Sequence, residues 1–361
     1  MGLAGARDAP EGRLRILFAV SDHGFGHATR TVALLRAALA LEPSLSVDLA
    51  GGRGSAAMLA ASFTGEPRVR LIPGPSDPGL LLYPGSLRVN TPGTRAAWDR
   101  WIAGWEGWIG EVSGRIAGMR AVISDVVPPA TLLAERLGVR SALLGNFLWT
   151  DTLAEHLEAP ALDRLRAAYA RAEHCFAYPF ALGFAGARPP ERLPLVARRP
   201  TRTRAEIRRS LGIGEREPLL WLSGGQSSDP LAVWRAAAAS GARSLAPAQI
   251  AAAIPGAAAV PADDPEGQDY LAAADLVVGK VGYGTLSEAL VSGVPLVMVL
   301  LDRTAETAPL VHGMLSAGAG EAVAEGDDLA PAISRLLGAA GRYERREDGS
   351  TEAARRVLAW L

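Results

Sequence analysis

The sequence predicts two α/β domains, each built on a parallel sheet. The chain has 361 residues, and at about 150 residues per domain this length favours two domains. Short apolar runs alternate with helical patterns along most of the chain, which is typical of βαβ units. Residues 187–204, rich in Pro and Arg, interrupt the alternation, and proline disfavours regular structure. We therefore expect a linker there.

The apolar runs give the expected elements in order. Before the linker we expect strands over 14–20, 46–50, 68–72, 121–124, 141–144 and 174–178, and helices over 28–41 and 128–137. After it we expect strands over 219–222, 257–260, 275–278 and 295–299, and helices over 285–291, 308–317, 328–337 and 351–361. The predicted domains are residues 1–186 and 205–361, the second including the C-terminal helix. Ligands bind beyond the carboxyl ends of such strands, so the loops after strands carry the candidate sites.

The composition argues against several classes of protein. The net charge of −1 leaves no basic excess for a phosphate backbone, so we expect no nucleic-acid partner. Cys175 is the only cysteine, which excludes an internal disulfide or a cysteine-based zinc site and fits a reducing compartment. The first apolar run, 14–20, is too short for a signal-peptide core or a membrane span. We expect a cytoplasmic protein, with peripheral membrane contact and oligomeric state left open.

The loop after the first predicted strand combines glycines with two histidines. Residues 21–30 read SDHGFGHATR and run into a helix. Glycines let the backbone turn sharply, and a helix start offers unpaired N–H groups and a positive dipole end. A neutral imidazole there can take a proton from an attacking hydroxyl. The sequence therefore predicts catalysis or ligand contact, the alternative being a tight turn with solvated histidines. It does not decide between His23 and His27.

Two further features of the first half are candidates for the same site. Asp125 follows a predicted strand, where its carboxylate could hold the tautomer of a histidine or cap the helix that begins at the prolines. Trp149 lies beside Asn146 after another predicted strand and is a candidate contact for an acceptor. Four tryptophans, Trp98, Trp101, Trp105 and Trp108, form one helical stripe, for which core packing is favoured over a sugar-stacking surface.

A glycine-rich segment, residues 279–285 (GKVGYGT), lies between a predicted strand and a predicted helix. Backbone N–H groups and a helix dipole favour a diphosphate there. Lys280, the only lysine, could add a charge or be a chance survivor in an Arg-rich chain. Glu288 could accept from two ribose hydroxyls or merely complement the helix dipole. The loops 223–228 and 302–306 also follow strands and offer phosphate or sugar contacts.

These motifs resemble a known group of proteins. Residues 24–30 (GFGHATR) and 274–289 look like the N-terminal glycosyltransferase-like region of plant L-arabinokinases and their bacterial relatives. The second segment is also similar to the donor-binding segment of the GT-B enzymes that make lipid II and monogalactosyldiacylglycerol. The resemblance covers most of the chain in order, although residues 231–265 match nothing. It implies the GT-B fold, two Rossmann-like parallel-sheet domains facing a central cleft.

The resemblance also implies roles for single residues. His27 matches the general base of inverting, metal-independent glycosyltransferases and Asp125 matches its partner, with His23 as the alternative base. On the donor side the candidates are Gly224, Gly225, Gln226, Lys280, Gly282, Tyr283, Gly284, Thr285, Ser287, Glu288, Asp302, Arg303 and Glu306. On the acceptor side they are Gly24, Phe25, Gly26, Arg30, Asn146 and Trp149. Thr304 and Ala305 stand where the family has glutamines, and Glu306 is a candidate substitute.

The expected function is sugar transfer from a nucleoside-diphosphate sugar, which we expect to be a UDP-sugar, to a hydroxyl of a small molecule or lipid. We expect no other cofactor and no metal, because the chain has no Asp-x-Asp pattern. Kinase activity is not expected, because the Gly-Leu-Gly-Ser-Ser-Ala-type ATP loop of arabinokinases is missing. The alternatives are a nucleotide-sugar epimerase or hydrolase of the same fold, and a non-catalytic sugar-nucleotide-binding module.

Overall fold

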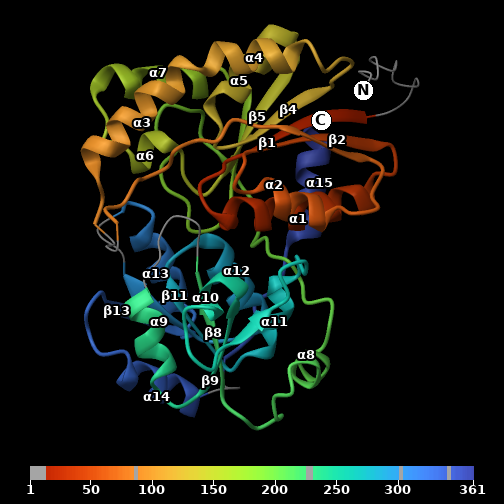
Figure 1. Cartoon of the computed structure of the whole chain (residues 1–361). Helices are drawn as coiled ribbons and strands as arrows, with labels where there is room; N and C mark the ends of the chain where they lie inside the picture. The colour runs from red at the N-terminus through yellow and green to blue at the C-terminus, as the bar shows by residue number, and fades with distance from the viewer. Residues whose placement is uncertain (1–13, 85–87, 225–230, 301–303, 340–342) are drawn as a thin grey trace. The chain divides into compact units, whose positions relative to one another are not determined.

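The computed structural model describes residues 14–84, 88–224, 231–300, 304–339 and 343–361. The chain divides into two compact units, each with its own parallel sheet (Figure 1). The first unit contains the residues up to Leu81, Asn90–Pro194 and Ser350–Leu361, and the second contains Leu82–Val89 and Leu195–Gly349. None of the helices in the described residues has the length and apolar character that crossing a membrane requires.

The first sheet has seven strands in the order β3-β2-β1-β4-β5-β6-β7, all parallel. They are β1 Leu14–Val20, β2 Leu45–Gly51, β3 Val69–Pro73, β4 Ala121–Asp125, β5 Arg140–Gly145, β6 His174–Ala177 and β7 Glu191–Arg192. From β1 the successive strands β2 and β3 are added on one side, and from β4 the strands β5, β6 and β7 are added on the other. The loops after β1 and β4 therefore diverge at the switch point of the sheet, where ligands bind in doubly wound folds.

Helices cover both faces of this sheet (Figure 1). One face carries α1 Phe25–Leu41, α2 Ala56–Ser62 and α15 Ser350–Trp360. The other carries α3 Thr91–Ala103, α4 Trp105–Ser113, α5 Pro128–Leu137 and α7 Ala159–Tyr169, and the short α6 is Trp149–Thr152. Strands β1, β2, β4, β5 and β6 are buried almost throughout, which explains why they are near-continuous apolar runs, whereas the edge strands β3 and β7 are exposed.

The tryptophan stripe extends over two helices, not one. The chain breaks between α3 and α4 at Gly104. The rings of Trp98 and Trp105 are buried, as expected for core packing. The indole N–H of Trp98 donates to the carbonyl of Gly79 at 2.8 Å. The stripe therefore ties α3 to the segment after β3.

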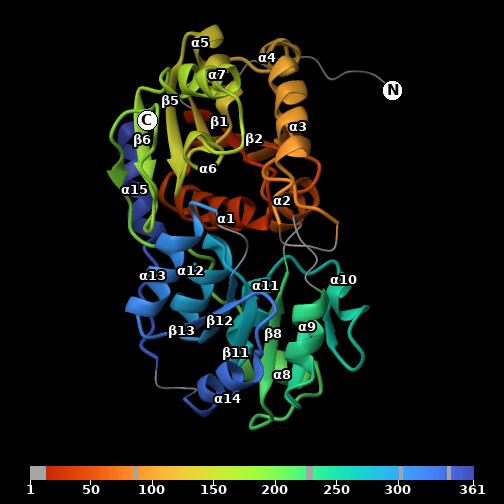
Figure 2. The ribbon, with the colours of Figure 1, turned by 90° about the vertical axis from the view of Figure 1, so that its left-hand side faces the viewer.

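The C-terminal helix belongs to the first unit, which corrects the prediction that placed it in the second domain. Helix α15 packs along α1 and beside β6 (Figure 2). Its buried face includes Ala354 and Val357. The guanidinium of Arg140 lies over the ring of Trp360 and donates to its carbonyl oxygen. The amphipathic pattern predicted the helix but could not show which unit its apolar face contacts.

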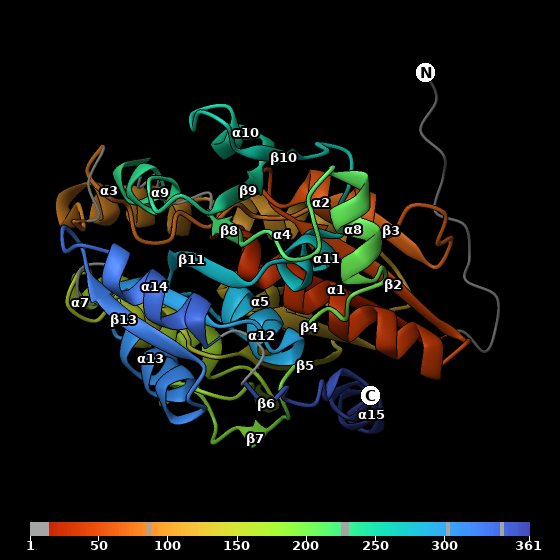
Figure 3. The same cartoon turned by 90° about the horizontal axis from the view of Figure 1, so that it is seen from below.

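The second sheet has six parallel strands in the order β10-β9-β8-β11-β12-β13 (Figure 3). The strands are β8 Leu219–Ser223, β9 Arg243–Pro247, β10 Ala258–Val260, β11 Leu276–Lys280, β12 Leu296–Leu300 and β13 Gly320–Ala324. The helices are α8 Arg204–Ser210, α9 Leu231–Ala238, α10 Ala248–Ala251, α11 Gly267–Ala273, α12 Tyr283–Ser292, α13 Thr307–Ser316 and α14 Ala330–Gly338. Its switch point lies between β8 and β11, so this sheet repeats the topology of the first.

Two of the points at which the chain passes between the units, at Leu195 and at Gly349, are hydrogen-bonded to each other within the second unit. The N–H of Gly349 donates to the carbonyl of Leu195 at 2.7 Å. The carboxylate of Asp348 accepts from Nε of Arg199 at 2.6 Å and from the N–H of Ala197 at 3.3 Å. The expected linker, 187–204, is therefore not a free connection. Its first part forms β7, and its last part is fixed in the second unit.

Candidate functional site

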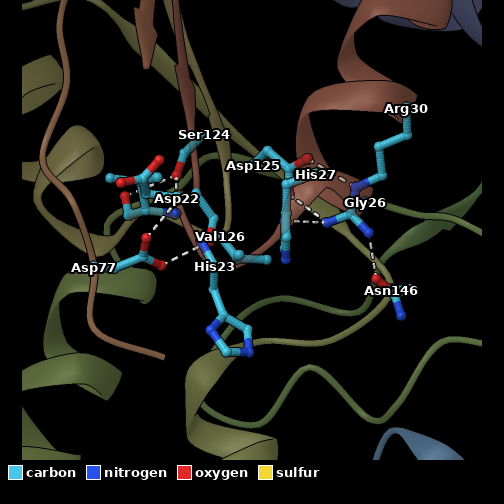
Figure 4. A network of polar contacts seen from close by, with 12 residues as sticks. Asp22, His23, Gly26, His27, Arg30, Asp77, Ser124, Asp125, Val126 and Asn146 are labelled. Carbon is cyan, nitrogen blue, oxygen red and sulfur yellow. Dashed lines mark hydrogen bonds and ion pairs between the residues drawn. The ribbon is translucent and has the colours of Figure 1, made fainter. Parts of the chain in front are cut away.

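The switch point of the first sheet brings His27 and Asp125 together. Val20, at the end of β1, pairs with Asp125, at the end of β4, and His27 lies in the first turn of α1. Nδ1 of His27 is 2.9 Å from Oδ1 of Asp125 (Figure 4). His27 is 5% exposed and Asp125 is fully buried. Among the described residues, Nε2 of His27 has no hydrogen-bond partner. The two predicted residues, which are 98 positions apart in the sequence, therefore form one pair.

The same carboxylate is held by Arg30, one turn further along α1. Nε of Arg30 donates to Oδ2 of Asp125 at 2.8 Å, and Nη2 donates to Oδ1. Nη1 of Arg30 donates to Oδ1 of Asn146, and the guanidinium lies over the ring of Tyr178. Burial by itself would raise the pKa of Asp125. The charges of Arg30 and His27 outweigh burial, so the pKa lies below its ordinary value and Asp125 is ionised at neutral pH.

A strained turn aims Asp125 into the site. The next residue, Val126, has φ 52, a left-handed conformation that is unusual for a β-branched side chain. Such a residue costs about 1–3 kcal/mol and persists only where its surroundings hold it. The hydroxyl of Tyr169 donates to the carbonyl of Val126, and Ser124 Oγ accepts from the N–H of Val127. Asp125 does not cap α5, whose N-cap is Val127 without a side-chain bond, so that alternative is wrong.

His23 lies apart from the pair. Its ring packs edge-on against Trp149, with ring centroids 5.3 Å apart, and points away from His27 and Asp125 (Figure 4). The ring also covers Gly79, where a Cβ atom would come 1.7 Å from its Nδ1. Within the described residues, the histidine that faces a carboxylate at this switch point is therefore His27.

Asp77, which sequence reasoning missed, fixes the loop after β1. Its Oδ2 accepts from the hydroxyl of Ser21 at 2.7 Å and from Nε1 of Trp149 at 2.9 Å. Its Oδ1 accepts from the N–H of Asp22 at 2.6 Å. The only sequence signal was an acidic residue soon after a predicted strand. Burial raises the pKa of Asp77 to about 6, although the hydrogen bonds from Ser21 and Asp22 lower it in part.

Asp77 should make the stability of the protein depend on pH. An unfolded aspartate has a pKa of about 3.9, so the folded state binds this proton more tightly. The stability that results is fully present below about pH 4 and is lost as the pH rises to about 6. Two units of pKa correspond to about 3 kcal/mol. In urea unfolding, the free energy of unfolding of Asp77→Asn should therefore fall less between pH 4 and pH 6.5 than that of the wild type.

A matched control is Asp163→Asn, because the Asp163 side chain is 70% exposed. It should keep the wild-type slope between pH 4 and 6.5. An Asp77→Asn protein with the wild-type slope would contradict the assignment of this pH dependence to Asp77.

Three of the expected acceptor contacts are buried supports. Arg30, Asn146 and Trp149 are each at most 2% exposed, and their polar groups bind other parts of the site. Their side chains are bonded to other residues of the first unit, and a direct contact with an acceptor stays a prediction. Phe25 is 39% exposed at the start of α1 and stays available for contact. Gly24, with φ 82, makes the turn into α1, and Gly26 follows within the helix.

At the switch point of the second sheet, two hydroxyls meet beside a helix start. Oγ of Ser223, at the end of β8, is 2.9 Å from Oγ1 of Thr285, in the first turn of α12. No described side chain caps the N-terminus of α12, whose N-cap is Gly282. A Cβ on Gly282 would meet no atom of the described residues within 4 Å. The arrangement suits an anion.

The glycine-rich segment is shorter as a loop than expected. Strand β11 continues through Gly279 and Lys280, and α12 already begins at Tyr283. A Cβ on Gly279 would come 2.7 Å from the carbonyl oxygen of Ser223, so this glycine allows β11 to pack closely against β8. Gly284 lies within the helix. The chain therefore turns from strand to helix in two residues.

Lys280 ends β11 beside an acidic partner. Burial lowers the pKa of Lys280, and the carboxylate of Glu306 opposes this shift. Glu306 is the N-cap of α13. Lys280 and Glu306, which were expected on the donor side from separate loops, therefore interact electrostatically at the carboxyl edge of this sheet.

Glu288 forms a buried ion pair that the sequence did not suggest. Its Oε1 accepts from Nε of Arg198 at 2.7 Å, and both side chains are less than a tenth exposed. Glu288 lies beyond the first turn of α12, so complementing the helix dipole does not explain it. Arg198 also donates to the carbonyl of Pro265 at 2.7 Å. No sequence signal marked Arg198, because it lies in the expected linker.

Two expected donor contacts serve the protein itself. The hydroxyl of Tyr283 accepts from the N–H of Val196 at 3.2 Å, and its ring is buried. The hydroxyl of Ser287 donates to the carbonyl of Gly284 at 3.0 Å and is also buried. Both hydroxyls therefore have partners within the second unit. Gly224 follows β8 directly, while Gly225, Gln226, Asp302 and Arg303 lie outside the described residues.

Comparisons with known proteins agree with this geometry. Residues 263–350 match the glycosyltransferase family 28 C-terminal domain. Over 324 residues the chain is 28% identical to L-arabinokinase from Arabidopsis thaliana, a match that covers 82% of this chain and 29% of that protein. The chain therefore spans less than a third of the length of this relative.

Solved structures share the fold over nearly the whole chain. A UDP-glucosyltransferase from Polygonum tinctorium that glucosylates indoxyl superposes with a TM-score of 0.62 at 14% identity, covering 97% of this chain and 99% of that one. The calicheamicin glycosyltransferase CalG4 gives a TM-score of 0.59 at 18% identity, covering 97% and 98%. The chain has the GT-B fold, and residues 263–350 resemble a glycosyltransferase C-terminal domain. Its sequence is similar to the L-arabinokinase of Arabidopsis thaliana, as the motifs predicted.

Proposed function

We propose that the protein is an inverting, metal-independent glycosyltransferase that moves a sugar from a nucleoside-diphosphate sugar to a hydroxyl acceptor. The observation that carries the proposal is the His27–Asp125 pair at the switch point of the first sheet, with Nε2 of His27 unbonded among the described residues. The family 28 match and the glycosyltransferase neighbours support sugar transfer as the reaction class.

The proton transfer follows from the pair. Asp125 accepts a hydrogen bond from Nδ1–H of His27, which leaves the lone pair of Nε2 to take the proton of the acceptor hydroxyl. The hydroxyl oxygen forms the new bond to the anomeric carbon. The bond from that carbon to the phosphate oxygen breaks, and its electron pair leaves with the nucleoside diphosphate. Attack opposite the leaving group inverts the anomeric centre.

The second unit supplies the features that suit the leaving group. The N-terminus of α12, the hydroxyls of Ser223 and Thr285 and the charge of Lys280 gather at one sheet edge. Helix N–H groups and a cation stabilise the charge that develops on a diphosphate. Oε2 of Glu288 has no partner among the described residues and suits a ribose hydroxyl. We propose a UDP-sugar donor, because a solved neighbour is a UDP-glucosyltransferase.

The proposal is tested by titration calorimetry with UDP, GDP, ADP and TDP, followed by mass spectrometry of reactions that contain a UDP-sugar and a panel of hydroxyl acceptors. We expect UDP binding in the presence of EDTA and a glycoside of opposite anomeric configuration. Absence of binding to every nucleoside diphosphate by the folded protein would refute the proposal. Turnover of the sugar nucleotide without any acceptor would favour the epimerase or hydrolase instead.

Lys280 provides a prediction for the donor side. Lys280→Met should weaken UDP binding by about tenfold or more, since a hydrogen bond to a charged group contributes about 1.5–3 kcal/mol. Uridine binding should change less than threefold, because uridine has no phosphate. Calorimetry with both ligands makes the comparison. An equal loss for UDP and uridine would place Lys280 away from the diphosphate.

A further inference from the structure

Arg30 is a buried cation in contact with both members of the His27–Asp125 pair. It lies three residues after His27 on α1, so the two side chains emerge on the same face of the helix. Its Nε and Nη2 bind the two oxygens of Asp125 as a fork. A guanidinium fork fixes the plane of a carboxylate as well as its charge. The tie to Asn146 and the ring of Tyr178 hold the guanidinium in turn.

Three atoms meet at the pair. Nδ1 of His27 is 2.9 Å from Oδ1 of Asp125 and 2.7 Å from Nη2 of Arg30. Nη2 carries only donors and Oδ1 is only an acceptor, so the proton on Nδ1 decides which contact is a hydrogen bond. An ionised carboxylate is the stronger partner, which places the proton on Nδ1 and leaves Nε2 unprotonated.

The charge of the cluster follows from this assignment. With a neutral His27, the charges of Asp125 and Arg30 cancel inside the protein. Uptake of a proton then leaves one net positive charge in a buried place, which is costly. Without Arg30 the same uptake would neutralise a buried negative charge. The carboxyl of Asp77 is the other titratable group that acts on His27.

We propose that Arg30 is a positioning residue for proton transfer, which orients the Asp125 carboxylate and keeps the buried cluster of His27, Asp125 and Arg30 neutral until His27 takes the acceptor proton. This inference rests on the proposed function for its catalytic meaning. Its structural content, the position of the proton and the charge balance of the cluster, does not depend on a substrate.

The experiment uses Arg30→Met and Arg30→Lys in the full chain. In Arg30→Met the pair should take up its first proton at a pH about one unit or more higher than in the wild type, since a neighbouring opposite charge shifts a carboxyl by about 1–3 units. The acid limb of kcat/KM should move to higher pH with it. Arg30→Lys should restore part of the shift, because it returns the charge without the fork.

Two measurements need no activity and therefore separate this inference from the proposed function. Side-chain ¹⁵N spectra of the wild type should show His27 with its proton on Nδ1. The urea midpoint of Arg30→Met should fall below that of the wild type at pH 7.5 and recover part of the loss at pH 5, where Asp125 can be protonated. If Arg30→Met does not fold, Arg30→Met/Asp125→Asn removes both charges, and its stability should change between pH 7.5 and pH 5 only as much as that of the wild type.

The matched control is Arg15→Met, which removes a cation from Asp48 at the start of β1. Arg70 still pairs with Asp48 at 2.7 Å, so this variant should show no recovery at pH 5. A wild-type His27 with its proton on Nε2 would overturn the inference. So would an Arg30→Met protein whose acid limb and stability profile match those of the wild type. Wild-type protein without any transfer activity would instead refute the proposed function.

Discussion

His27→Asn is expected to lower kcat for sugar transfer by about 10²–10⁴-fold, the usual contribution of a general base. Asparagine can keep an N–H group near the position of Nδ1 and so keep the contact to Asp125. It has no counterpart of Nε2, so it cannot take the proton of the acceptor. The affinity for UDP should stay within about twofold, because the donor features lie in the other unit. Initial rates and calorimetry on the same preparations measure both quantities.

His23→Asn is the matched control for this variant. His23 belongs to the same loop but packs on Gly79 and Trp149 and not on Asp125. Its substitution should reduce kcat by less than about tenfold, well below the effect of removing a general base. If His23→Asn lowers kcat more than His27→Asn does, the base is His23 and the assignment of His27 is wrong.

Arg198→Met is expected to destabilise the second unit by about 3–5 kcal/mol, the usual result of leaving one charge of a buried pair without its partner. The charge left behind is that of Glu288, which is buried in α12. Urea unfolding followed by tryptophan fluorescence measures the loss, since Trp221 and Trp234 report on the second unit. Arg198→Met/Glu288→Gln should recover much of it, because the uncompensated charge is gone.

An exposed pair in the same unit provides the comparison. Arg335 binds Glu321 at 2.7 Å with a side chain that is 62% exposed. Arg335→Met should cost less than about 1 kcal/mol, as expected for a surface ion pair. Equal losses for Arg198→Met and Arg335→Met would show that Arg198 does not compensate a buried charge.

The two parallel-sheet units were predictable from the sequence because long apolar runs that alternate with helical patterns are easy to recognise, whereas the strand order came from the structure. Strand β1 and the helix after it were expected almost where they occur. Strand β9, Arg243–Pro247, was missed, since its short apolar stretch is flanked by Arg and Pro. The turn at residues 279–285 was expected to be a long loop, because glycine suggests irregular structure. Gly279 is instead a strand residue that lets two backbones approach.

The contact between His27 and Asp125 was predictable for a related reason. His27 comes soon after β1 and Asp125 ends β4, and parallel strands bring their carboxyl ends to one edge. The sequence did not show which residues hold the pair in place. Arg30 and Trp149 were expected to contact an acceptor, but partners distant in the sequence turn them into buried supports. Arg198 had no local signal at all, since its meaning comes from a carboxylate 90 residues away.

The hydrogen bond between Gly349 and Leu195 has a consequence for the modularity of the chain. Apart from the short segment Leu82–Val89, the second unit is one continuous stretch whose two ends meet. A module with adjacent ends can be inserted into a host domain, or exchanged for another, without displacing the halves of the host. The first unit is such a host, since its last helix comes after the insertion. On the proposed function, replacement of this whole module would change donor specificity and leave His27, Asp125 and their supports as they are.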